Sequence, residues 1–248
     1  MSSDLSSKWK YIDIHAHIIP GVDDGAENME ESMSMIEKAY QEGIRAIIAT
    51  PHYGKWNPDY NKTYALGRFR ELYAEVKKVH PDMKLFFGNE IFYGAEVIED
   101  LRSGRAMTLG GTDYVLVEFS TEADRSTIEE GLREFVSAGY RPVLAHVERY
   151  SSLHGDLKSV RELIENGTYI QVNARSYLGK ITSRRTLWCR RLLDERMVHF
   201  IASDCHDAAV RKPVMKSAVD EMLRIAWDDI VTDVVHTNIM KLVKNELI

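Results

Sequence analysis

Residues 11–25 read YIDIHAHIIPGVDDG, an apolar stretch that carries two histidines and ends in two aspartates. Its four isoleucines are typical of a strand buried on both faces. His15 and His17 are two positions apart, so in a strand their side chains point to the same face. The stretch therefore predicts a first strand that presents two imidazoles to one cation, followed by an acidic turn.

Short apolar segments alternate with amphipathic segments along the rest of the chain. Strands are predicted at 11–19, 45–50, 84–89, 113–119, 141–146, 169–173 and 198–203. Helices are predicted at 29–43, 62–79, 127–138, 157–166, 184–195, 214–225 and 230–247. Apolar strands separated by helices imply parallel pairing in repeated βα units. We expect an α/β barrel, with an open doubly wound sheet as the alternative, in a single domain over residues 1–248.

The composition excludes several classes of protein. Lys and Arg total 32 against 38 Asp and Glu, a net charge of −6, which favours neither nucleic-acid nor anionic-membrane binding. Cys189 and Cys205 alone make no disulfide framework. The N-terminal segment MSSDLSSKWK is polar, and no run approaches the ~18 apolar residues of a membrane span. We expect a cytoplasmic protein without nucleic-acid partners or direct membrane insertion.

Side chains of the types that bind metals follow nearly every predicted strand. Parallel strands bring their carboxyl ends to one face, where such side chains converge. The candidates are His15, His17, His52, Glu90, Glu118, His146, Asp204 and His206. Imidazoles with carboxylates suit zinc, manganese or iron better than calcium or magnesium alone, and several carboxylates suggest more than one cation.

Two arginines lie close to these candidates in the sequence. Arg149 and Arg211 could bind a phosphate or carboxylate through bidentate hydrogen bonds. The alternative is an ordinary salt-bridged arginine, with Glu148 as a partner for Arg149. The loop YGKWNPDYN at 53–61 could stack an aromatic substrate on its rings, although simple packing of the loop is favoured.

Cys205 and Arg211 have the Cys-x5-Arg spacing of cysteine-dependent tyrosine phosphatases. Such a loop cradles a phosphate with backbone N–H groups and usually needs glycines, which are missing here. Strand alternation also turns the thiol away from the flanking Asp204 and His206. We therefore do not expect a nucleophilic cysteine.

Taken together, these motifs resemble the PHP family of metallophosphoesterases, and within it the bacterial capsular and exopolysaccharide tyrosine-protein phosphatases of the CpsB/CapC-like group. The similar segments between residues 11 and 213 are DIHAHIIPGVDDG, TPH, GNEIFYG, YVLVEFS, PVLAHVERY, QVNARSYLG and IASDCHD. The resemblance implies a distorted (β/α)7-type TIM-like barrel, the PHP domain, with three metal ions. These ions are usually manganese, with iron, zinc or magnesium as alternatives. It adds Asp24 to the ligands, leaves Asp23 as a turn or supporting residue, and assigns phosphate contacts to Arg149 and Arg211.

The expected function is that of a manganese-dependent protein-tyrosine phosphatase, a phosphoric monoester hydrolase that uses metal-activated water. The resemblance implies a phosphotyrosine protein substrate, the tyrosine-rich C-terminal tail of a bacterial tyrosine kinase that controls capsule or exopolysaccharide synthesis. One alternative is a small-molecule phosphoesterase such as histidinol-phosphate phosphatase. Others are a catalytically silent, metal-stabilised binding module and, last, an amidohydrolase. The sequence is also compatible with an oligomer.

Overall fold

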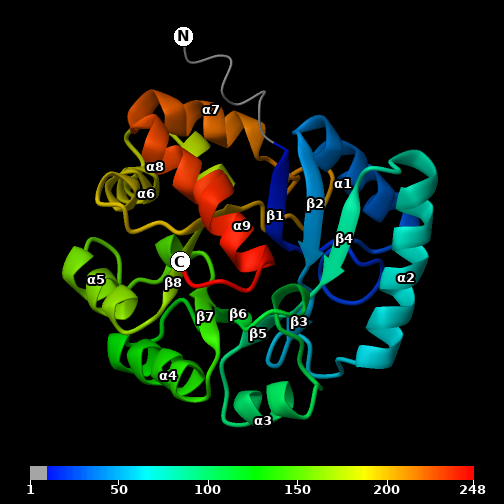
Figure 1. Cartoon of the computed structure of the whole chain (residues 1–248), viewed down its shortest axis with the longest axis horizontal. Helices are drawn as coiled ribbons and strands as arrows, with labels where there is room; N and C mark the ends of the chain where they lie inside the picture. The colour runs from blue at the N-terminus through cyan, green and yellow to red at the C-terminus, as the bar shows by residue number, and fades with distance from the viewer. Residues whose placement is uncertain (1–9) are drawn as a thin grey trace.

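A computed structural model describes residues 10–248 (Figure 1). The polar segment at residues 1–9 lies outside the described residues. The strands are β1 (Tyr11–Ala16), β2 (Ile44–Ala49), β3 (His52–Tyr53), β4 (Lys84–Phe87), β5 (Glu90–Phe92), β6 (Tyr114–Glu118), β7 (Arg141–Leu144), β8 (Tyr169–Asn173) and β9 (Phe200–Ala202). The α-helices are α1 (Met29–Gln41), α2 (Lys62–Val79), α3 (Val97–Arg102), α4 (Arg125–Ser137), α5 (Leu157–Glu165), α6 (Arg184–Asp194), α7 (Lys216–Ile225), α8 (Asp228–Thr232) and α9 (Asn238–Val243). Short 3₁₀ turns are η2 (Leu109–Gly111), η3 (Val147–Arg149) and η4 (Ala174–Leu178), and η5 (Asp233–Thr237) is a π-helical segment.

All paired strands of residues 10–248 run parallel, in two sheets of order β1-β2-β4 and β3-β5-β6-β7-β8-β9. Ala16 forms a parallel bridge with Cys205, three residues after the end of β9, so the last strand returns to the first. Helices surround the curled strands (Figure 1). This closure confirms the predicted barrel-like α/β class over an open sheet.

The interior of the barrel is filled with apolar side chains. Ile14, Leu116 and Val143 from three strands form one buried cluster with Ile239 and Leu242. The latter two come from α9, which therefore closes one end of the barrel with its apolar face. The opposite end, where the parallel strands finish, is left for polar side chains.

The second and third predicted strands are confirmed as β2 and β4 with shifted ends, but each is followed by a short strand, β3 or β5, that the sequence interpretation did not include. β2 ends before Pro51, and the chain resumes as β3 in the other sheet. β4 likewise ends before Gly88, and β5 begins at Glu90. Pro51 has no N–H to donate to the ladder of β2. Its carbonyl accepts a hydrogen bond from the Asn89 side-chain amide at 3.0 Å. His52 and Glu90 therefore begin short second strands and are register partners between β3 and β5.

The predicted helices are confirmed with shifted ends, apart from the last. The segment predicted as one helix at 230–247 is divided into α8, η5 and α9, and α3 was not predicted. Side-chain caps fix several starts, as where Asn28 accepts from the Glu31 amide and Ser183 from the Thr186 amide. Across residues 10–248, no helix combines the length and apolar character that crossing a membrane requires.

Candidate metal centre

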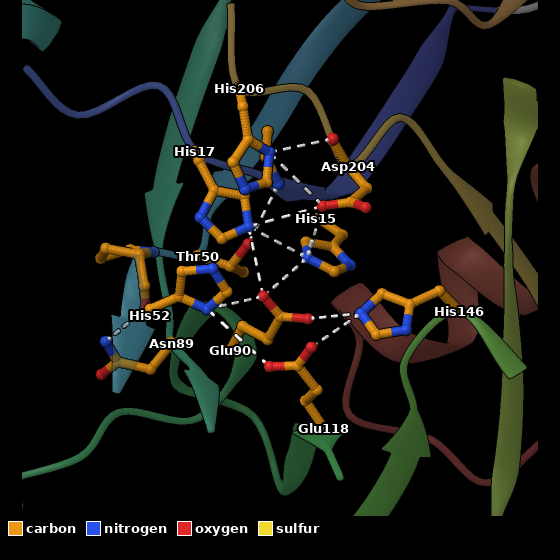
Figure 2. Close-up of polar contacts among 12 residues, drawn as sticks. His15, His17, Thr50, His52, Asn89, Glu90, Glu118, His146, Asp204 and His206 are labelled. Carbon is orange, nitrogen blue, oxygen red and sulfur yellow. Dashed lines mark hydrogen bonds and ion pairs between the residues drawn. The ribbon is translucent and has the colours of Figure 1, made fainter. Parts of the chain in front are cut away.

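Imidazoles and carboxylates from separate strands point toward one another at the carboxyl end of the barrel (Figure 2). Nε2 of His15 lies 3.2 Å from Nε2 of His17. Two nitrogens that bind one cation at about 2.1 Å lie roughly 3.0–3.4 Å apart, so this distance suits a shared cation. The prediction that the two rings share a face is confirmed.

The structure brings all nine predicted side chains together. Three overlapping groups each offer donor atoms within 4.8 Å of one another: His17, Asp24, His52 and His206; His15, His17 and Asp204; and His52, Glu90 and Glu118. His146 adjoins the third group, with Nε2 at 2.9 Å from Oε1 of Glu90 and 3.5 Å from Oε1 of Glu118. Residues far apart in the sequence thus form one continuous cluster.

Several buried atoms in this cluster have no hydrogen-bond partner in the described structure. They include Nδ1 of His52 and one oxygen each of Glu90 and Glu118. Nδ1 of His52 nevertheless lies 3.0 Å from Oε2 of Glu90. Buried polar atoms that face each other without a hydrogen bond are costly, and a cation between them would satisfy both. The donor set, five imidazoles and four carboxylates, fits divalent transition metals.

Asp23 holds the ring of His17 from behind. Its Oδ2 lies 2.7 Å from Nδ1 of His17 and also accepts from the His52 backbone N–H at 2.9 Å. An imidazole that donates from Nδ1 keeps its Nε2 lone pair for a metal. Asp24, by contrast, is exposed, and its Oδ1 lies 3.3 Å from Nε2 of His52 and 3.5 Å from Nε2 of His206. The predicted division of roles between the two aspartates agrees with this geometry.

A buried amide network supports the opposite side of the cluster, and sequence reasoning missed it. Oε1 of Gln171 accepts from the His146 backbone N–H at 2.8 Å and lies 3.3 Å from Nδ1 of His15. Its Nε2 donates to Oδ1 of Asn173, whose Nδ2 donates to Oδ2 of Asp204 at 2.8 Å. The signal was present, since Gln171 and Asn173 are the polar residues of the otherwise apolar β8.

Two of the converging residues have left-handed backbones, which is unusual for residues other than glycine. His146 has φ 35° and Asp204 has φ 49°. Such strain often accumulates where a side chain must take a functional position. The orientation of Asp204 toward His206 thus comes from a turn after β9 and not from strand alternation, which corrects the reasoning although the two side chains do meet at 3.6 Å.

Burial and neighbouring charges shift the pKa values of several side chains in the cluster. Burial disfavours ionisation of Glu90, but the nearby imidazoles, His15 foremost, hold the pKa of this carboxyl well below its usual range. Burial, followed by repulsion from Glu90, raises the pKa of Glu118 to about 7. Burial and then Arg149 lower the pKa of His146 to about 4. Carboxylates this close together repel one another when ionised, so nearby positive charge would stabilise their ionised forms.

Both predicted arginines converge on one oxygen of Asp204. Nη2 of Arg149 lies 2.5 Å and Nη2 of Arg211 lies 3.0 Å from Oδ2, while Oδ1 lies 3.4 Å from Nε2 of His15. Asp204 thus separates the imidazole cluster from the guanidinium pair. Each guanidinium keeps donors that the carboxylate does not use.

Glu148 does not pair with Arg149, so that alternative is wrong. Its buried carboxylate accepts instead from the Ser176 hydroxyl at 2.7 Å and from the Asn173 backbone N–H at 3.2 Å. Arg149 is therefore available to the site.

The family model for "Capsular polysaccharide synthesis, CpsB/CapC" matches residues 11–244. The chain belongs to this family. It is 32% identical over 242 residues to the tyrosine-protein phosphatase CpsB of Streptococcus agalactiae serotype III (strain NEM316), covering 96% of this chain and 100% of that protein. A solved structure of the metal-dependent tyrosine phosphatases YwqE from Bacillus subtilis and CpsB from Streptococcus pneumoniae matches with TM-score 0.88, at 29% identity over 96% of each chain.

A more distant structure supports the fold of this CpsB/CapC family member. Histidinol phosphate phosphatase from Lactococcus lactis, complexed with zinc, L-histidinol and phosphate, matches with TM-score 0.56 over 87% of this chain and 92% of that chain. The identity is 13%, so the likeness concerns the barrel alone.

In this CpsB/CapC family member, Cys205 belongs to the core. Its side chain is buried, and burial raises the pKa of the thiol far above its usual range, with Asp13 adding to the effect. The Cys205 carbonyl accepts from the His17 backbone N–H at 2.9 Å, so the residue joins β1 to the turn after β9. A buried thiol with a raised pKa is not a nucleophile, as predicted.

The aromatic loop after His52 divides into two parts. Tyr53 and Tyr60 pack edge to face, with ring centroids 5.2 Å apart. Trp56 is 53% exposed and lies edge-on to Phe92, while Nζ of Lys55 lies 4.8 Å from the Trp56 ring centroid. The packing interpretation therefore holds for the tyrosines and in part for Trp56, whose ring packs on Phe92 but leaves about half of its surface exposed.

Proposed function

We propose that this protein is a manganese-dependent protein-tyrosine phosphatase that hydrolyses phosphotyrosine in a protein substrate. The observation that carries the proposal is the position of Asp204, with one oxygen toward the histidine cluster and the other held by Arg149 and Arg211. A phosphate placed against that boundary would meet metal-binding side chains on one side and guanidinium groups on the other. Relatives that span most of this chain are named tyrosine-protein phosphatases.

We infer that the nine converging side chains hold three cations, one for each donor group. Manganese is proposed, with iron, zinc or magnesium as alternatives, because the donors are imidazoles and carboxylates without thiolates. Divalent cations held there would polarise the phosphoryl oxygens and lower the pKa of a bound water to about 7.

The arginines would bind and orient the phosphate. Both reach it from the rim, where Arg149 is 30% and Arg211 is 38% exposed. The Asp207 carboxylate accepts from the Arg211 backbone N–H at 2.9 Å and fixes the turn that carries this residue. The N–H donors of Arg149 and Arg211 would offset charge on the equatorial oxygens in the transition state. The tyrosyl leaving group has a pKa near 10, so it needs less proton assistance than an alkoxide.

The proposed physiological substrate is the tyrosine-rich C-terminal tail of a bacterial tyrosine kinase that controls capsule or exopolysaccharide synthesis. We propose that the protein acts on it in the cytoplasm as a single domain.

Hydrolysis of a phosphotyrosine peptide by the purified, manganese-loaded protein tests this proposal. Activity should fall at least about a hundredfold with EDTA and in His17→Ala, because metal assistance supplies several kcal/mol of transition-state stabilisation. Histidinol phosphate is the matched small substrate. A strong preference for it would overturn the protein-substrate assignment, and bound metal without hydrolysis of any aryl phosphate would indicate a silent binding module.

A further inference from the structure

A polar pocket of about 410 Å³ adjoins the metal centre and shares Arg149, Asp204 and Arg211 with it. Its other walls come from η4, the turn that follows, and the first turn of α6, which contribute Arg175 and Arg185. Apart from Gly179, every residue that lines it has a polar or charged side chain. A hollow of this size suits a small ligand, and its lining suits a charged group better than an aromatic ring.

Positive charge dominates this pocket because its two acidic residues, Glu148 and Asp204, already have hydrogen-bond or ion-pair partners. Glu148 accepts from Ser176, and Asp204 is paired with the two arginines of the site. In contrast, no ion pair joins Arg175 or Arg185 to a carboxylate of residues 10–248, although Arg175 attracts the Asp207 carboxylate at longer range. The one hydrogen bond of Arg175 in this part of the chain runs to the Lys212 carbonyl at 3.4 Å. Their guanidinium groups remain available for bidentate binding of an anion.

The positive region continues into a neighbouring pocket of about 390 Å³. That pocket shares Glu148, Arg149 and Arg185 with the first and adds Arg184 and His154. Burial, then Arg184 and Arg185, lowers the pKa of His154, which reports the positive potential there. Since the whole chain has a net charge of −6, the concentration of arginines is a local feature.

We propose that Arg175 and Arg185 form a second anion subsite, which selects phosphotyrosine segments that carry another negative group close to the phosphotyrosine. That group is a carboxylate or a second phosphate, both of which match the planar fork of arginine. The inference rests on the proposed function, because the scissile phosphate must lie at Arg149 and Arg211. In a segment bound there, the side chains that flank the phosphotyrosine would lie beside the pocket, because Arg149, Asp204 and Arg211 line both sites.

Three phosphotyrosine peptides test the subsite: one with neutral neighbours, one with adjacent glutamates, and one with a second phosphotyrosine. We expect kcat/KM to be about tenfold higher for the charged peptides than for the neutral one, the effect of one charge-assisted contact. Comparison of the two charged peptides identifies whether carboxylate or phosphate is preferred. The advantage should shrink at high salt, because exposed arginines are screened.

Arg175→Gln and Arg185→Gln should each reduce this ratio, and the double variant should bring it close to one. Arg133→Gln removes an equal charge from the exposed face of α4 and should keep the ratio. Metal content checks that each variant is folded. A ratio near one in the unmodified protein, or a ratio that Arg175→Gln and Arg185→Gln leave intact, would overturn the subsite. Absence of hydrolysis of all three peptides and of a simple aryl phosphate would instead overturn the proposed function.

Discussion

Oδ2 of Asp23 lies 2.7 Å from Nδ1 of His17, on the side of the ring that faces away from the cluster. The contact fixes the tautomer and leaves Nε2 of His17 directed at Nε2 of His15, 3.2 Å away. His17 also takes part in two of the three donor groups. Asp23, which belongs to none of the three donor groups, thus positions a ring that two of them share.

Replacement of Asp23 by alanine should weaken metal binding by about 10–100-fold without removing a ligand, the usual effect of losing a supporting hydrogen bond. Competition with a fluorescent chelator measures this affinity. Asp24→Ala is the matched comparison and should lower the metal stoichiometry, because it deletes a donor from one group. Equal affinity and stoichiometry in Asp23→Ala and the unmodified protein would contradict the supporting role.

Gly25 is required by the close approach of its backbone to His17. A Cβ at this position would lie 2.1 Å from the His17 carbonyl oxygen and 2.5 Å from the His17 Cβ. Gly25→Ala should therefore cost at least about 2 kcal/mol of unfolding free energy and reduce metal content, since His17 must move. Gly67→Ala in α2 is the control, where the added methyl meets nothing within 4 Å and should stabilise by about 0.5–1 kcal/mol. Urea denaturation distinguishes them, and equal stability of the two variants would refute the steric argument.

Most of the barrel and eight of the nine converging side chains could be predicted from the residues themselves, because they follow from local rules, whereas Asp24 came only from the family resemblance. Apolar strands alternating with amphipathic helices specify parallel βα units, and His-x-His specifies a shared face. The short strands β3 and β5 were not predicted, because the tertiary contacts around them, such as the Asn89 side-chain amide donating to the Pro51 carbonyl, cannot be read from the sequence. The Gln171 network was missed for the same reason, because the sequence alone does not reveal the hydrogen-bond partners of a polar residue in an apolar strand.

Removal of the metals should destabilise the protein. Without cations, four carboxylates are left in one largely buried cluster, where burial and Glu90 already raise the pKa of Glu118 to about 7. Saturation of a site at a hundred times its Kd contributes about 2.7 kcal/mol. A loss of that size corresponds to about 5–10 °C in Tm for a chain of this length. Differential scanning fluorimetry with EDTA, followed by manganese, should show this decrease and its recovery. An unchanged Tm after verified metal removal would argue against a metal centre that stabilises the fold.

Cys205→Ala should retain turnover at full metal loading. The thiol is buried in the core, and its raised pKa keeps it protonated. The substitution removes one buried sulfur, so it should cost about 1–2 kcal/mol of unfolding free energy. His206→Ala, one position further along, should instead lose metal and activity. Loss of all phosphotyrosine hydrolysis in a folded, metal-loaded Cys205→Ala protein would require a cysteine mechanism.

His199 should make the protein less stable in mild acid for a reason independent of the metals. Its Nδ1 accepts from the Ile170 backbone N–H at 3.1 Å, and burial lowers the pKa of the ring to about 4 from 6.5. The unfolded chain takes up this proton as pH falls below about 6.5, whereas the folded chain does not until about pH 4. Stability is therefore lost across this interval, by at most about 3 kcal/mol from this residue.

His199→Asn keeps an acceptor for the Ile170 N–H but cannot titrate. Urea titrations at pH 7 and pH 4.5 should show the variant less stable than the unmodified protein at pH 7 and closer to it at pH 4.5. A difference that stays constant with pH would show that His199 is protonated equally in the folded and unfolded states.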